Sequence, residues 1–143
     1  MIYSMISKTI KSMITTVINP FDNGTGNPEK VINGNFATDS AWSKDSGWSI
    51  SGGKANCNSD GSEGTRDLSQ IILDVGETYN LSLEIVSFVS GNLYLWNGSS
   101  NILIGNSVGI KNIIFTAGIT TFIINASGGF VGSIDTVSVK ETP

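Results

Sequence analysis

The chain has 143 residues, 17 glycines, 14% charged residues and a net charge of −4 at neutral pH. This length fits one domain with a sizeable core, and few charges among many turn-forming residues are typical of an all-β domain. The acidic balance argues against a nucleic-acid surface, which needs clustered Lys and Arg. No apolar run approaches the about 20 residues of a transmembrane helix.

The apolar residues of the N-terminal segment recur at helical spacing, which predicts an amphipathic helix. They are Ile2, Ile6, Ile10, Met13, Ile14 and Val17. Because several of them are β-branched, an extended arm is the alternative. A signal peptide also competes, but the apolar stretch at residues 13–18 is short and lacks a cleavage site of small residues.

Asn19 and Pro20 end this segment, because a residue before proline avoids the helical conformation. Residues 21–30 then form a connector of turn-forming residues. A short segment cannot bury an apolar stripe alone, so it must pack on the domain, a membrane, copies of itself or another protein. The segment has only two lysines, so a membrane surface is the least favoured of these partners. We therefore predict a docking and oligomerisation arm at residues 1–30 and a folded domain at residues 31–143.

From Val31 onward, short alternating stretches separated by turns predict about eight strands. Nine stretches show this pattern, and they cover residues 48–50, 54–57, 68–75, 79–85, 93–96, 101–104, 112–116, 121–125 and, after a glycine-rich turn at 128–133, 134–140. This pattern predicts an all-β fold, a two-sheet antiparallel jelly-roll β-sandwich.

The chain contains one cysteine and no histidine. These counts exclude histidine-based catalytic triads, imidazole metal sites and a disulfide within one chain. Cys57 alternates with Ala55 in an expected strand, so we expect it to be a small buried hydrophobe, with a reactive thiol as the alternative.

Several short motifs occur in one order along residues 31–141. They are Asn33-Gly34-Asn35-Phe36, Trp42, Trp48, Gly52-Gly53-Lys54-Ala55, Gln70, Gly76-Glu77-Thr78-Tyr79, Phe115-Thr116-Ala117 and Ile134-Asp135-Thr136-Val137-Ser138-Val139. Together they resemble the carbohydrate-binding-module-like jelly rolls of family 4/9 type, which are galactose-binding-like sandwiches. In secreted glycosidases such modules bind polysaccharide. Similar modules, often behind a short N-terminal segment, occur in the fibres, tail components and capsid decorations of tailed phages.

The chain looks more like the phage group, because the sequence shows no catalytic domain or convincing signal peptide and has an N-terminal segment suited to docking. The resemblance implies a non-enzymatic virion-surface protein that contacts other virion proteins through residues 1–30 and binds a host glycan. We expect a homotrimer, because three apolar stripes can bury one another. The alternative is an extracellular carbohydrate-binding module.

Three aromatic residues are candidates for glycan or partner binding, because sugar rings stack on exposed aromatic faces. Trp42 matches a family position that is usually in or near the core, so packing is its competing role. Tyr94 and Trp96 share one face of an expected strand, opposite Leu93 and Leu95. One pair faces the core and the other faces out, and the sequence leaves the choice open.

Many members of the family hold a structural Ca²⁺ where the first and last strands meet. The matching oxygen donors here are Asn35 and Asp135, although Ala37 stands where an acidic residue is common. Alternatively, Asp135 accepts hydrogen bonds from backbone amides of the opening turn.

Most other acidic residues fall in expected turns, with Glu84 the exception. No spacing pairs two of them for glycoside hydrolysis.

Overall fold

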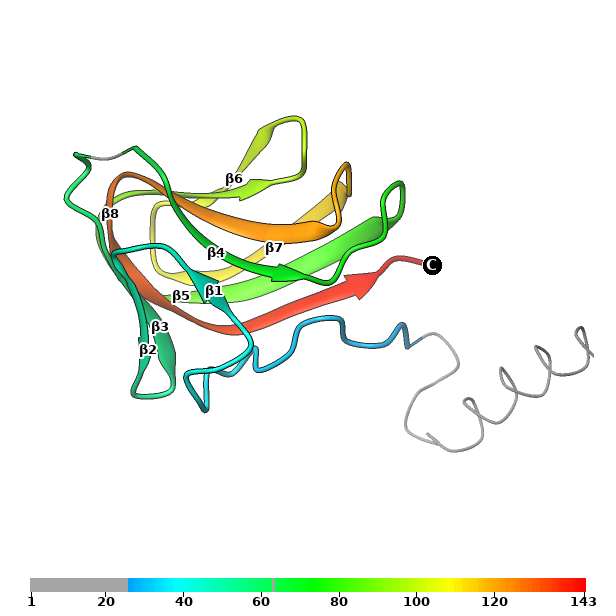
Figure 1. Ribbon diagram of the computed structural model, residues 1–143, viewed down its shortest axis with the longest axis horizontal. Helices are drawn as coiled ribbons and strands as arrows, with labels where there is room; N and C mark the ends of the chain where they lie inside the picture. Colours follow the sequence, from blue (N-terminus) through cyan, green and yellow to red (C-terminus); the bar gives the residue numbers. More distant parts are fainter. Residues whose placement is uncertain (1–25, 63) are drawn as a thin grey trace, which may run out of the picture.

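The computed structural model describes residues 26–62 and 64–143 of the protein (Figure 1). The predictions for Ile2, Ile6, Ile10, Met13, Ile14 and Val17 lie outside these residues. All regular elements in the described residues are strands. No helix there is long and apolar enough to cross a membrane.

The described residues form eight strands. They are β1 (Ser43–Lys44), β2 (Trp48–Ser51), β3 (Lys54–Asn58), β4 (Arg66–Ile71), β5 (Thr78–Trp96), β6 (Asn101–Gly105), β7 (Gly109–Thr116) and β8 (Thr121–Glu141). All pairings between them are antiparallel. The structure thus confirms the all-β jelly-roll sandwich.

Two long strands, β5 and β8, pair with each other over almost their whole length and pass through both layers of the sandwich (Figure 1). In the first layer the strand order is β1-β4-β8-β5-β6, using the start of β8 and the end of β5. In the second layer the order is β2-β3-β8-β5-β7, using the other halves of the two long strands. The layers are therefore two parts of one bent sheet.

The hydrophobic core lies between the layers and follows the alternation of the strands. In the first layer Leu68, Ile124 and Leu95 form one fully buried row across three strands. In the second layer Val139 and Leu81 form a comparable row. The core rows fix which residues of each strand face out.

The bends of β5 and β8 are where the sequence prediction was wrong. Residues 79–85 and 93–96 were expected as separate strands, as were 121–125 and 134–140 with a turn between them. Irregularities in pairing between Ser82 and Asn92 absorb the bend without ending either strand. Gly91, with φ of 80°, allows the close crossing, because a Cβ there would lie 2.4 Å from the Phe130 backbone.

The strand expected at residues 68–75 is shorter than predicted. β4 ends at Ile71, because the backbone amides of Ile72 and Leu73 both donate to the carbonyl of Thr120 instead of continuing the ladder. The hairpin expected at residues 48–57 is confirmed as β2 and β3, and Gly52 and Gly53 provide its positive φ angles.

The opening and closing motifs of the chain lie against each other. The Val137 amide donates to the Gly34 carbonyl, and the Lys30 amide donates to the Val139 carbonyl, both over 2.9 Å. The Glu29 carboxylate accepts the amides of Val31 and Val139. Figure 1 shows this N-terminal stretch beside the end of β8. The residues just before Val31 therefore belong to the packed domain.

Cys57 is 3% exposed and lies in the core beside β8. Burial raises the pKa of its thiol to about 11 and outweighs the opposing effect of Arg66. The expected role of Cys57 as a small buried hydrophobe is confirmed.

Gly34 provides a test of the joint between the chain ends. A Cβ on residue 34 would lie 2.0 Å from the Val137 carbonyl oxygen. We expect Gly34→Ala to lower the free energy of unfolding by roughly 3 kcal/mol, at the upper part of the range for overpacked sites. Urea titration followed by circular dichroism measures the change.

The matched control is Gly52→Ala, where a Cβ meets nothing within 4 Å and only the positive φ is unfavourable. It should cost about 1 kcal/mol. Equal losses in the two variants would show that the close approach to Val137 does not matter.

Candidate functional site

Tyr94 and Trp96 point outward from the first layer. Leu93 and Leu95, which alternate with them on β5, are fully buried, whereas Tyr94 and Trp96 are half-buried. The structure thus decides between the two orientations that the sequence left open. Two aromatic rings spaced two residues apart on one strand lie about 6.8 Å apart along the surface.

The register of the neighbouring strands surrounds these rings with a mixed surface. Tyr94 lies between Asn125 of β8 and Leu103 of β6, and Trp96 lies between Ile123 and Asn101. On β4, Asp67 is opposite Asn125 and Ser69 is opposite Ile123. We call this outward surface the Tyr94 face, and it comprises Asp67, Ser69, Tyr94, Trp96, Asn101, Leu103, Ile123 and Asn125.

Two oxygen atoms of the Tyr94 face are buried without a hydrogen-bond partner. They are Oδ1 of Asn125 and Oδ1 of Asp67. Asn125 as a whole is 8% exposed. A buried acceptor that has lost water and gained no donor lowers stability. Both acceptors lie in the same row of the sheet as the half-buried ring of Tyr94.

Asp45 lies next to Asp67 at the margin of this face. The Asp67 amide donates to Asp45 Oδ2 over 2.9 Å, and the Asp45 amide donates to the Asp67 carbonyl over the same distance. Burial, and then the charge of Asp45, raise the pKa of the Asp67 carboxyl.

The sequence prediction missed this carboxylate pair because it placed most acids in turns. Asp67 is in fact a strand residue. Its neighbours follow from the pairing of β4 with β8, which brings together residues 58 positions apart. The available signal was the alternation of residues 66–71, with Leu68 and Gln70 buried and Asp67 and Ser69 on the opposite side.

Trp42 lies in the core and is not part of the Tyr94 face. It is 8% exposed, and its ring centre is 5.3 Å from that of Phe36 and 6.3 Å from that of Phe122. Its indole nitrogen donates to the Asn33 carbonyl over 3.0 Å. Packing and support of the opening turn are the roles that its position allows.

The two predicted calcium ligands each accept a local hydrogen bond. Asn35 Oδ1 accepts the Ala37 amide, and Asp135 Oδ1 accepts the Thr136 amide of its own strand, not an amide of the opening turn. The described residues contain no group of three or more His, Cys, Asp or Glu side chains suited to a metal. A calcium ion would have to take most of its six to eight oxygens from backbone carbonyls and water.

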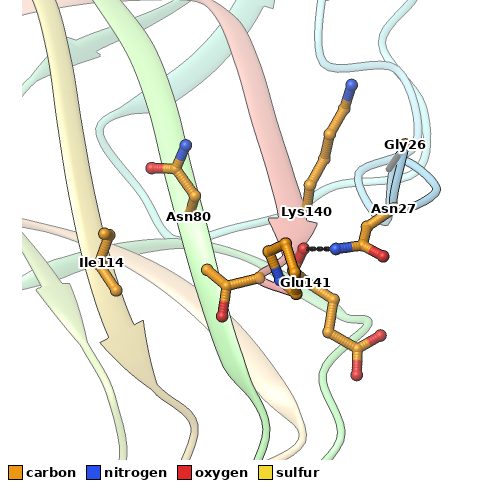
Figure 2. Close-up of a pocket in the computed structure, with 8 residues that line it drawn as sticks. Gly26, Asn27, Asn80, Ile114, Lys140 and Glu141 are labelled. Atoms are coloured by element: carbon orange, nitrogen blue, oxygen red, sulfur yellow. Dashed lines mark hydrogen bonds between the residues drawn. The ribbon is translucent and has the colours of Figure 1, made fainter. Parts of the chain in front are cut away.

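A hollow of ≈ 340 Å³ lies on a different surface, the outer side of the second layer. Figure 2 shows Asn27 and Glu141 on one side, Asn80 in the middle and Ile114 on the far side. The Asn27 amide nitrogen donates to the Glu141 carbonyl at its edge. The hollow carries none of the side chains of the Tyr94 face.

Comparison with solved structures places the fold among carbohydrate-binding modules. The second N-terminal cellulose-binding domain of a Cellulomonas fimi β-1,4-glucanase is similar with a TM-score of 0.54 and 17% identity, over 82% of this chain and 97% of that one. A second similar structure is that of the CBM22-1–GH10 modules of the Clostridium thermocellum xylanase 10B in complex with xylohexaose. Its TM-score is 0.51 and its identity 13%, over 82% of this chain but 29% of that one.

A domain of bacteriophage CBA120 tailspike protein 4 is also similar, but its TM-score of 0.44 is too low to carry an argument. No protein-family model matches the sequence, and no curated protein sequence matches it. The chain therefore has the jelly-roll fold of carbohydrate-binding modules, as the sequence motifs predicted.

Calcium dependence tests the predicted site at Asn35 and Asp135. If the ion binds, millimolar CaCl₂ should raise the thermal midpoint by roughly 8 °C over EDTA, because a ligand at about 100 times its Kd adds about 2.7 kcal/mol. Asp135→Ala should abolish the difference, and differential scanning fluorimetry measures it.

The control is Glu77→Ala, which removes an acidic residue far along the sequence from the two predicted ligands. It should keep the calcium response. A midpoint that is the same in CaCl₂, MgCl₂ and EDTA would contradict the calcium prediction and leave Asp135 as an acceptor for its own strand.

Proposed function

We propose that this protein is a non-enzymatic glycan-binding module that binds its ligand on the Tyr94 face. The observation that carries the proposal is the outward position of Tyr94 and Trp96 on β5, on the side opposite the buried Leu93 and Leu95. The fold supports it, since a similar solved structure is a cellulose-binding domain.

The chemistry of the face matches that of a sugar chain. The aromatic rings offer flat apolar surfaces to the C–H faces of pyranose rings. Ser69 and the exposed Asn101 on the same face offer hydrogen-bonding groups to the hydroxyl groups at the ring edges.

The carboxylates of Asp45 and Asp67 act in this proposal as acceptors and not as a catalytic pair. Asp45 Oδ2 is already engaged by the Asp67 amide, which fixes its position next to β4. The raised pKa of Asp67 follows from burial and from its neighbour, and structural carboxylate pairs show such shifts as well as catalytic ones.

Removal of either aromatic ring should weaken glycan binding. We expect Trp96→Ala and Tyr94→Ala each to lower affinity at least about fivefold, because aromatic anchors typically cost more than about 1 kcal/mol when truncated and about 1.4 kcal/mol is a factor of ten. A glycan array that includes cello-oligosaccharides and xylohexaose identifies the ligand, and calorimetry with that ligand measures the loss.

Two further variants separate binding from folding. Asn101→Ala removes an exposed polar side chain opposite Trp96 and should weaken binding without lowering the thermal midpoint. Val89→Ala changes an exposed residue in the bend of β5 and should leave both unchanged. Absence of binding to every glycan would contradict the proposal, and release of reducing ends during titration would contradict its non-enzymatic part.

We further propose that the module is displayed on the surface of a tailed-phage virion, as a capsid decoration or fibre component. The resemblance of the motifs and the apolar stripe of residues 1–30 support this setting. The position of the chain entry supports it too. Residues 27–30 are attached to the end of β8 in the second layer, so an anchored N-terminal segment leaves the Tyr94 face of the first layer free. An extracellular module without a virion is the alternative.

Oligomeric state tests the docking role of the N-terminal segment. We expect the full chain to form a trimer of the 15.1 kDa protomer and a variant without residues 1–25 to be a monomer, because the apolar stripe is the proposed contact. Light scattering coupled to size-exclusion chromatography measures both masses. A monomer in both cases, together with no affinity for virions, would contradict display through this segment.

A further inference from the structure

Two carboxylates and an amide oxygen meet at one corner of the first layer. Asp45 directly follows β1, Asp67 lies near the start of β4, and Asn125 lies on β8 directly opposite Asp67. Directly opposite residues of an antiparallel pair have Cβ atoms about 5 Å apart. Asp45 Oδ2 accepts the Asp67 amide over 2.9 Å. We call these three side chains the acidic corner.

Two oxygens of the acidic corner are buried and make no hydrogen bond with the described residues. They are Asp67 Oδ1 and Asn125 Oδ1, and Asn125 is 8% exposed. A carboxylate and an amide oxygen are both acceptors, so neither supplies the proton that a hydrogen bond between them requires. Two such acceptors, buried without a partner, lower stability. A positive charge between them would compensate both oxygens at once.

The two carboxylates of the acidic corner also disfavour each other's charge. Burial, and then the charge of Asp45, raise the pKa of the Asp67 carboxyl. The neighbouring Lys44 donates to Asp39, and the guanidinium of Arg66 donates to a serine hydroxyl in the turn after β1. A cation from solution would relieve the repulsion between the two carboxylates.

The donor atoms of the acidic corner determine which kind of cation fits. All three donors are oxygens, and the chain has no histidine and one cysteine, which is buried. Carboxylate and amide oxygens are ligands that Ca²⁺ takes, in flexible geometry and at about 2.3–2.6 Å. This distance is shorter than a hydrogen bond, so a dehydrated ion can lie between oxygens that a water molecule does not reach. The exposed Asp45 leaves an open side on which water completes the coordination.

We propose that the acidic corner is a calcium site with Asp45, Asp67 and Asn125 as its side-chain ligands. The ion joins the end of β1 to β4 and β8 and supplies the partner that the two buried oxygens lack. This site is separate from the one predicted at Asn35 and Asp135, which belongs to the opening and closing motifs.

Terbium luminescence tests the proposal, because Tb³⁺ occupies calcium sites and emits when a nearby aromatic ring is excited. Tyr94 lies opposite Asn125 on the next strand and provides that ring. The measurement uses the full-length protein with Asp135→Ala, which removes the other predicted site. We expect Asp67→Asn to weaken Tb³⁺ binding at least about tenfold, because calcium affinity depends on the number of charged ligands. Calorimetry with CaCl₂ measures the calcium affinity of the same proteins.

Two further variants separate ligation from other effects. Asp74→Asn is the matched control, because it makes the same change at a side chain that is 71% exposed, pairs with Lys30 and lies outside the acidic corner. It should leave the affinity unchanged. Asn125→Asp keeps an oxygen donor but removes the amide N–H groups, so binding should persist or become tighter.

Three outcomes would overturn the proposal. Equal weakening by Asp67→Asn and Asp74→Asn would show a general attraction of the ion to acidic residues. Loss of binding in Asn125→Asp would show that the amide is needed as a donor. Absence of binding before any of these changes would exclude the ion, and a thermal midpoint that falls as the pH rises would then assign the missing partner to a proton on Asp67. Thermal midpoints of all variants verify that each one remains folded.

Discussion

The pairing of β5 with β8 is the constraint on which the rest of the structure depends. Every other strand except β1 and β2 pairs directly with one of these two, and the two layers are joined because both long strands bend together. The bend is possible because glycine at position 91 lets the two backbones approach. The core rows and the outward rows of both layers follow from this single ladder.

The same ladder creates the candidate site. Asp67, Asn125 and Tyr94 come from three strands and meet in one row, because β8 lies between β4 and β5 at this level. The row keeps buried acceptors without donors, which a protein selected for stability alone would replace with apolar side chains. Polar groups that lower stability and lie in one row with outward-facing aromatic rings are typical of functional surfaces.

Local patterns in the sequence predicted the fold but only half of the site. Alternation around Leu81 and Leu95 is a local signal, as is the turn at Gly52, so the strands and the sandwich could be inferred. The orientation of Tyr94 depends on which face of β5 meets the other layer, and that is a property of the assembled sheet. Asp67 and Asn125 are neighbours only through strand pairing across 58 positions, a relation that no local pattern carries.

β8 comes after all the strands that pair with it, and this order has a consequence for how the protein is made. β3, β4 and β5 all need β8 as a partner, and Glu29 near the start of the domain bonds to Val139 across 110 positions. Closing such long loops is slow, so a sheet dominated by distant pairings folds slowly. The growing polypeptide cannot complete the first layer until residues 121–126 have left the ribosome, or the second layer until the rest of β8 has followed. Until then β4 and β5 lack β8 as a partner strand, and unpaired strand edges of this kind are prone to aggregation.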